Sequence, residues 1–200
     1  MNTLPQRLCS TDRRDGTLTF IDGDHASPVR WSELDRDARS MAVALAGRGI
    51  GPGSHVAVLG PTTRPLVTTI EATWLVGATV VVLPLPMRMS SIEEFVQETR
   101  NRIHRADVDL LVIDPELAPF LTPEAGDPPA VGYSEVQGVA DAADYRMPVI
   151  GPEELAILQF TSGSTSAPKG VMLPHQTLLA NVDGILGALE VDPARDVAVS

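Results

Sequence analysis

Short apolar runs rich in β-branched residues alternate with segments of helical periodicity in the first half of the chain. We expect strands at His55–Gly60, Thr79–Leu83 and Val108–Ile113, because their residues favour extended backbone. Between them, Leu66–Val76 and Ser91–Arg105 repeat apolar residues at the spacing of one helix face. Strands that alternate with helices pair side by side through right-handed crossovers. The pattern therefore predicts the α/β fold class, with layers of helices on both faces of a parallel sheet.

The residues before this alternation predict an antiparallel hairpin and one more helix. Thr17–Ile21 alternates polar and apolar residues, Asp22-Gly23 supplies a tight turn, and Val29–Trp31 resumes an extended run. Ser32 is expected to cap a helix that continues to the glycine-rich stop at Gly49–Gly53. This N-terminal unit leads directly into the first strand of the predicted sheet.

Residues 114–152 differ in composition from the rest of the chain. They hold seven of the 17 prolines, with glycines and acidic residues among them. We interpret this Pro/Gly-rich segment as a surface connection between two parts of the sheet, with one strand near Ala130–Tyr133.

The last fifty residues return to regular structure. We expect a strand at Leu155–Phe160, a short return strand at Val171–Leu173 and a helix at His175–Leu189. Asp196–Ser200 begins another strand and stops inside it, with no cap or tail. We therefore expect residues 1–200 to be a truncated part of a longer chain.

Composition and charge exclude several classes of protein. The chain is 44% apolar and 20% charged, so it can bury enough surface to fold. Its net charge of −11, without a cluster of Lys or Arg on one face, argues against a nucleic-acid partner. The longest apolar run, Leu75–Met87, contains two prolines and is shorter than the roughly 20 residues of a membrane span. With one cysteine, Cys9, and no secretory signal, we expect a soluble, cytoplasmic protein without disulfides.

The segment that carries the chemistry is Thr161–Gly170, which follows directly after a predicted strand. It contains five hydroxyl residues, and Gly163 lets backbone N–H groups converge on an anion. Lys169 adds a positive charge in an otherwise acidic protein. We therefore predict a phosphate-binding loop. Its candidate ligand-binding residues are Thr161, Ser162, Gly163, Ser164, Thr165 and Lys169.

This loop differs from the Walker A loop, which needs Gly-Lys followed by Ser or Thr. Here Pro168 precedes Lys169 and Gly170 follows it. The fixed φ of Pro168 suggests a loop that is ordered over the nucleotide and shifts during turnover. From the residues alone, a Ser/Thr-rich surface turn without a ligand stays open as the alternative.

Two stretches resemble the signature of the adenylate-forming superfamily, which includes acyl-CoA synthetases, adenylation domains and luciferases. They are Leu158–Thr165 (LQFTSGST) and His175–Asn181 (HQTLLAN), and both are most similar to fatty acyl-AMP ligases. The shorter matches upstream are Trp31–Leu34, Gly51–Gly53 and Gly77-Ala78. Most of the superfamily has Gly at the position of Ser166, whereas fatty acyl-AMP ligases often carry a different residue there. Ser166 therefore favours the fatty acyl-AMP ligase branch. Lys169 is common to the whole superfamily.

The resemblance implies an ATP-dependent ligase that activates a fatty acid as an acyl-adenylate. ATP and Mg²⁺ are the implied cofactors, and Lys169 is the implied catalytic residue within the β/γ-phosphate clamp. The acyl group would then pass to an acyl carrier protein, or to coenzyme A in the synthetase branch. The family's Mg²⁺ ligand, ribose-binding aspartate, adenine pocket, acyl tunnel and mobile C-terminal domain all lie downstream. We therefore expect these 200 residues to bind nucleotide weakly and to catalyse nothing.

Two other functions stay open. One is a coenzyme A synthetase or an amino-acid adenylation domain of the same superfamily. The other is a short, non-catalytic remnant that binds a nucleotide or a partner.

The remaining candidate residues favour structural roles. His175 follows Pro174 at a helix start and has no carboxylate or serine beside it in the sequence. His25, His55 and His104 do not have the spacing of metal ligands, so we expect no metal site made of protein side chains alone. Trp74 is expected in the core, with a place in an acyl tunnel as the alternative.

Overall fold

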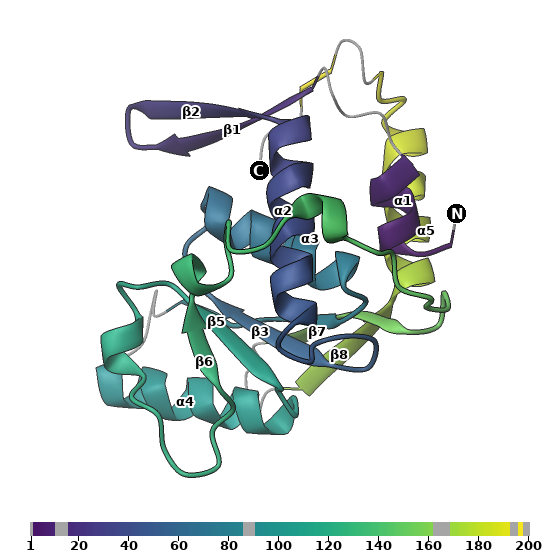
Figure 1. Cartoon of the computed structure of the whole chain (residues 1–200). Coiled ribbons are helices and arrows are strands. Elements are labelled where there is room, and N and C mark those ends of the chain that lie inside the picture. The colour runs from purple at the N-terminus through teal and green to yellow at the C-terminus, as the bar shows by residue number, and fades with distance from the viewer. Residues whose placement is uncertain (1, 11–15, 86–90, 162–168, 193–195, 198–200) are drawn as a thin grey trace.

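A six-stranded sheet forms the centre of the molecule (Figure 1). The computed structural model describes residues 2–10, 16–85, 91–161, 169–192 and 196–197. The strand order is β6 (Ala130–Gly132), β5 (Leu110–Ile113), β3 (His55–Leu59), β4 (Thr79–Val82), β7 (Leu155–Thr161) and β8 (Lys169–Pro174). The first five strands in this order are parallel, and β8 pairs antiparallel with β7. The predicted α/β class with a mostly parallel sheet is confirmed.

The two faces of the sheet are covered by different helices (Figure 1). The helices are α1 (Leu4–Ser10), α2 (Trp31–Ala46), α3 (Arg64–Leu75), α4 (Ile92–Arg105) and α5 (His175–Ala188). In β3, Val56 and Val58 face α2 and α3, whereas Ala57 and Leu59 face α4, because successive side chains of a strand point to opposite faces. Burial on both faces explains why this strand is an unbroken apolar run.

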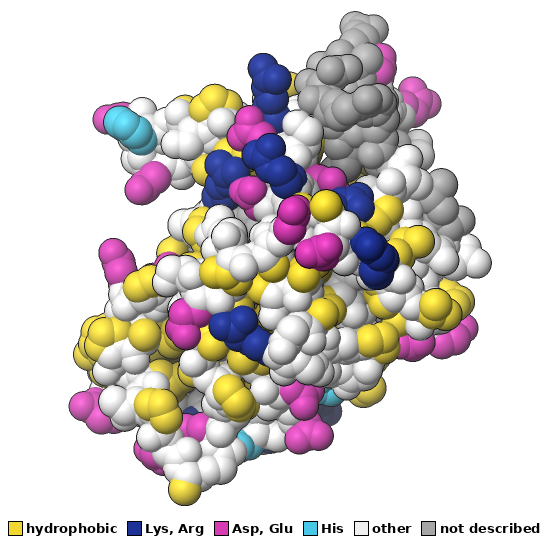
Figure 2. Space-filling model, in the orientation of Figure 1, with side chains coloured by type: hydrophobic (Ala, Val, Ile, Leu, Met, Phe, Trp, Pro, Cys, Tyr) yellow, Lys and Arg dark blue, Asp and Glu magenta, His cyan; other side chains and the backbone are white. Residues whose placement is uncertain are grey.

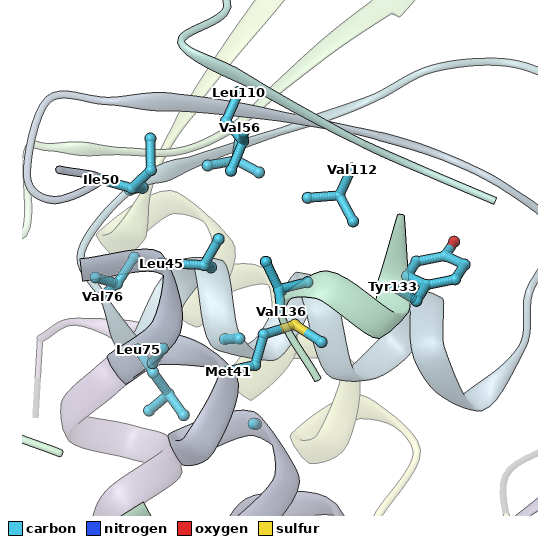
Figure 3. Packing of buried hydrophobic residues seen from close by; sticks show 14 residues of the cluster. Met41, Leu45, Ile50, Val56, Leu75, Val76, Leu110, Val112, Tyr133 and Val136 are labelled. Carbon is cyan, nitrogen blue, oxygen red and sulfur yellow. The ribbon is translucent and has the colours of Figure 1, made fainter. Parts of the chain in front are cut away.

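Figure 3 shows the core on the α2/α3 side of the sheet. Met41 and Leu45 of α2 lie between Leu75 of α3 and the strand residues Val56 and Val112, and all five are fully removed from solvent. Burial of each such side chain stabilises the fold by about 1.5–3 kcal/mol. This cluster joins α2 and α3 to the sheet.

The N-terminal hairpin forms as predicted, but the helix after it begins two residues earlier. β1 (Thr17–Asp22) pairs antiparallel with β2 (His25–Arg30) in a two-stranded sheet of their own. The predicted cap at Ser32 is wrong, because Arg30 is the last extended residue and Ser32 lies inside the first turn of α2. The backbone N–H of Trp31 donates to the Gly16 carbonyl at 3.0 Å, which ties the helix start to the hairpin.

Residues 114–152 contain the predicted short strand, β6, and three single 3₁₀ turns at Ala118–Phe120, Tyr133–Glu135 and Ala142–Asp144. The segment is not all surface. Its buried apolar side chains are Leu121, Tyr133, Val136 and Ile150. After β6 the chain crosses to β7, which lies beyond β5, β3 and β4 in the sheet. This long connection therefore joins one edge of the sheet to its other half.

Of the C-terminal elements, α5 agrees with the prediction, whereas the described part of the last predicted strand does not. α5 has the predicted bounds to within one residue. Of the strand expected at 196–200, Asp196 and Val197 are described and adopt no regular structure, while the rest lies outside the described residues. No helix among the described residues has the length and apolar character that crossing a bilayer requires.

Candidate functional site

The carboxyl ends of β3, β4, β5 and β7 lie at one edge of the sheet, because these strands are parallel. In open α/β sheets, ligands bind at this edge, where neighbouring strands send their connections to opposite faces. β3 leads to α3 on one face and β4 leads to α4 on the other (Figure 1). β7 lies beside β4, with Val82 opposite Gln159, and ends at the same edge. The predicted phosphate loop therefore follows a strand end that lies beside the place where the connections of β3 and β4 turn to opposite faces of the sheet.

β7 and β8 hold the two ends of that loop together. They pair from Leu155 opposite Pro174 to Thr161 opposite Lys169, so that residues 162–168 connect a hairpin. Thr161 and Lys169 are thus brought directly across from each other. The other predicted residues, Ser162, Gly163, Ser164 and Thr165, lie outside the described residues.

The base of the hairpin combines a buried anchor with an exposed cation. Leu158 of β7 is buried on the α4 side, and Phe160 packs partly against the same cluster. Gly170 lies opposite Phe160, and a Cβ there would meet the Leu158 and Phe160 side chains at 3.5 and 3.7 Å, an ordinary contact. Lys169, one residue earlier, is exposed. The Lys169 side chain therefore lies at the surface of the hairpin, where its charge carries no burial cost.

A second group of residues, which the sequence analysis missed, meets at the same edge of the sheet. Tyr133 comes from the turn after β6, Asp114 follows β5 and Gly60 follows β3. A Cβ on Gly60 would lie only 2.5 Å from the Tyr133 hydroxyl, so this close approach requires glycine. Burial and the Asp114 charge raise the pKa of Tyr133 to about 12, so the hydroxyl stays protonated to a higher pH than that of an exposed tyrosine. The only sequence signal for this group was a glycine at a strand end.

His175 has the structural role that the sequence favoured over a catalytic one. Its side chain is fully buried, and its Nδ1 accepts a hydrogen bond of 3.3 Å from the backbone N–H of Leu4. Burial lowers the pKa of His175, and the opposing charge of Glu154 does not reverse this effect. A neutral imidazole that accepts a hydrogen bond from α1 fastens the N-terminus to the start of α5.

The other candidate residues also pack or pair within the fold. Trp74 is half-buried beside Val58 and donates its indole N–H to the Ala156 carbonyl at 2.9 Å, which fits the predicted core position. His104 contacts the Asp127 carboxylate at 3.1 Å. Among the described residues, no three His, Cys, Asp or Glu side chains gather closely enough to hold a metal ion. Figure 2 shows basic and acidic side chains intermixed on the visible face, not separated into a basic patch.

Comparison of the sequence with known proteins gives a consistent result. The profile described as AMP-binding enzyme matches residues 11–200. The Mycobacterium tuberculosis protein Rv1013, which is named as a ligase, is 30% identical over 197 residues that cover 94% of this chain and 34% of the relative. A feruloyl-CoA synthase of an Amycolatopsis species is 33% identical over 182 residues, or 86% of this chain and 34% of the relative. The chain thus spans about a third of the length of these relatives.

Solved structures show the same fold. The fatty acyl-adenylate ligase of L. pneumophila, solved in complex with acyl adenylate and pyrophosphate, superposes with a TM-score of 0.82 at 22% identity. The match covers 96% of this chain and 34% of that protein. The described fold is therefore that of the N-terminal part of adenylate-forming enzymes.

Proposed function

Because the chain belongs to the AMP-binding enzyme family, we propose that it supplies the phosphate-binding loop of a ligase that activates a fatty acid with ATP. In this proposal, residues 1–200 are part of the large N-terminal domain of a cytoplasmic enzyme, and residues 114–152 connect two parts of its sheet. The observation that carries the proposal is the pairing of Thr161 with Lys169 in β7 and β8, at the carboxyl edge of the sheet, where α/β proteins commonly bind ligands.

The reaction transfers an adenylyl group to a carboxylate. A carboxylate oxygen attacks the α-phosphorus of ATP, the bond to the bridging oxygen breaks, and pyrophosphate leaves with the electron pair. The loop would donate hydrogen bonds from its backbone N–H groups and hydroxyls to the β- and γ-phosphates, while Lys169 balances the growing negative charge. Mg²⁺ is proposed as the cation that accompanies the triphosphate and neutralises part of its charge.

The acyl acceptor distinguishes the two enzyme branches. We propose an acyl carrier protein first, because the segments 158–165 and 175–181 are most similar to fatty acyl-AMP ligases. Coenzyme A is the second candidate, which the feruloyl-CoA synthase relative favours. Incubating the full-length protein with fatty acid, ATP and coenzyme A distinguishes them, since acyl-CoA forms only in the synthetase branch. An acyl-adenylate that accumulates until a carrier protein is added supports the first candidate.

The loop assignment is tested by Lys169→Ala in the full-length protein. Loss of a well-placed charge-stabilising group lowers the rate of such reactions about 10²–10³-fold, or about 2.7–4 kcal/mol. We expect a loss of this size in fatty-acid-dependent ATP–pyrophosphate exchange. Lys169→Arg is the matched control, because it keeps the positive charge and should recover part of the rate. A rate that stays within about tenfold of the wild type, about 1.4 kcal/mol, contradicts the assignment.

The isolated 200-residue chain gives a separate test. We expect weak binding of ATP and no pyrophosphate exchange, because the groups that the family resemblance places downstream are missing from it. Binding of ATP without catalysis even in the full-length protein would favour the non-catalytic alternative. Exchange catalysed by the 200-residue chain would contradict the proposal that it holds only part of the site.

A further inference from the structure

A cavity of about 330 Å³ opens between the C-terminal half of α2, the turn at residues 50–52 and residues 144–146. We call it the α2 cavity. The turn comes before β3, and Val76, which also lines the cavity, comes before β4. The α2 cavity therefore lies at the amino edge of the sheet, opposite to the edge at which the predicted phosphate loop begins. Small-molecule sites measure about 300–1,000 Å³, so a cavity of this size suits a ligand smaller than a nucleotide.

The wall of the α2 cavity is apolar and held in place by the fold. Its apolar lining residues are Ala42, Val43, Ala46, Ile50, Pro52 and Val76. Ile50 and Val76 are buried members of the core cluster in Figure 3. On one side, the Gly51 N–H donates to the Ser54 hydroxyl at 3.2 Å, which fixes the turn. On the other side, the Tyr145 hydroxyl donates to the Leu75 carbonyl at 3.1 Å. Such a preformed apolar wall suits a compact aliphatic group.

Two opposite charges stand at the rim of the α2 cavity. Asp144 and Arg146 both line it, and both are exposed. Arg146 Nη1 donates to the carbonyls of Ala143 and Tyr145 at 2.9 and 2.8 Å, which holds the guanidinium in place. Within the described part of the chain, neither Arg146 nor Asp144 forms an ion pair, although only one residue separates them. Unpaired opposite charges beside an apolar cavity fit a ligand that carries both charges and an apolar body.

We propose that the α2 cavity binds a free α-amino acid with a branched aliphatic side chain. The Asp144 carboxylate accepts hydrogen bonds from the ammonium group of the ligand, and the remaining N–H groups of Arg146 donate to its carboxylate. The aliphatic side chain enters the apolar part of the cavity. A carboxylate without an ammonium group fits less well, because it leaves the Asp144 charge uncompensated. The proposal depends neither on the phosphate loop nor on ATP.

The first test is isothermal titration calorimetry of the full-length protein with L-leucine, without ATP. We expect saturable binding at one site per chain. Isocaproate lacks the ammonium group of leucine, and isoamylamine lacks its carboxylate. Each analogue should bind at least about tenfold more weakly, because hydrogen bonds between charged groups are lost. If L-leucine, L-isoleucine and L-valine all show no saturable binding up to about 10 mM, the proposal is overturned.

Three variants locate the bound amino acid. Arg146→Gln and Asp144→Asn each remove one charge and should weaken L-leucine binding at least about tenfold. Ala46→Trp fills the cavity from an exposed position of α2 and should abolish binding. Arg105→Gln is the matched control, because Arg105 is an exposed arginine at the end of α4, on the other face of the sheet, and should leave the affinity unchanged.

The thermal unfolding midpoint of each variant without ligand shows whether it folds, and the three substitutions give independent readings of the same site. L-leucine bound at the site of the proposed reaction would be unaffected by them. Unchanged binding in all three variants therefore overturns the proposal. None of these measurements contains ATP, so failure here is distinguishable from failure of the proposed function.

Discussion

The strands β3, β4 and β5 and the hairpin β7–β8 belong to one sheet but differ in how they are covered. The three central strands are enclosed between α2 and α3 on one face and α4 on the other (Figure 1). β8 and α5 instead expose apolar side chains at the end of the sheet. The region that is packed on both faces supplies the stability of this unit. The region proposed to carry the chemistry is the one whose apolar side chains are exposed.

The largest difference between the two regions is expected when one leucine in each region is replaced by alanine. Leu75 of α3 is fully buried, and Leu75→Ala should lower the free energy of unfolding by about 2–5 kcal/mol because it leaves a cavity. Leu186 of α5 is 39% exposed, and Leu186→Ala in the 200-residue chain should cost less than about 0.5 kcal/mol. Urea unfolding of both variants measures the two costs. Equal costs would contradict the contrast between a closed and an open region.

The close approach at the carboxyl edge should give the next largest effect. Gly60→Ala places a methyl group 2.5 Å from the Tyr133 hydroxyl and 3.1 Å from Asp114 Cβ, so the neighbours must move. We expect a cost of about 1–3 kcal/mol in unfolding free energy. Tyr133→Phe removes the hydroxyl, so the double variant should be less destabilised than the sum of the two single variants. Additive effects in this cycle would mean that the hydroxyl does not limit the space at Gly60.

A smaller effect is expected at the ion pair between α4 and the segment of residues 114–152. Asp127 is paired with Arg100 at 3.1 Å. Burial raises the pKa of Asp127, but the Glu124 backbone N–H, Arg100 and His104 outweigh it, so the net pKa is lowered. A carboxyl group whose pKa is lower in the folded state stabilises the fold above its unfolded pKa of about 3.9, and this contribution is lost as pH falls through the folded value.

Asp127→Asn removes this titration and should cost about 1–2 kcal/mol at pH 7. Below the pKa of the folded wild type, the two proteins should converge in unfolding free energy. Urea unfolding at a series of pH values measures both curves. A gap that persists unchanged down to pH 2 would show that the carboxylate charge contributes nothing.

The sequence predicted the helices and strands that are indicated by residues close together in the chain. The apolar runs of β3, β4, β5 and β7 predicted strands because strands covered on both faces need uninterrupted apolar residues. The start of α2 was missed by two residues, because Ser32 has the chemistry of a cap while the observed cap position is Arg30. Such a boundary depends on the Trp31–Gly16 hydrogen bond, which joins residues distant in the chain.

The candidate site was predictable in outline but not in its surroundings. Thr161 and Lys169 were identified from the composition of their segment, and the structure places them opposite each other. The meeting of Gly60, Asp114 and Tyr133 had no sequence motif, because it arises only when β3, β5 and the turn after β6 are brought together. Contacts of this kind depend on strand order, which local residue patterns do not encode.

The long connection from β6 to β7 has a mechanical consequence. It is fastened along its course where Arg48 donates to the Glu135 carbonyl at 2.8 Å, Ser40 donates to the Ala140 carbonyl at 2.6 Å and the Tyr145 hydroxyl donates to the Leu75 carbonyl at 3.1 Å. Ser40 lies in α2, Leu75 is the last residue of α3, and Arg48 lies two residues after the end of α2. A single protease cut within it would therefore leave both fragments bound to each other, so that a nicked molecule would still migrate as one particle.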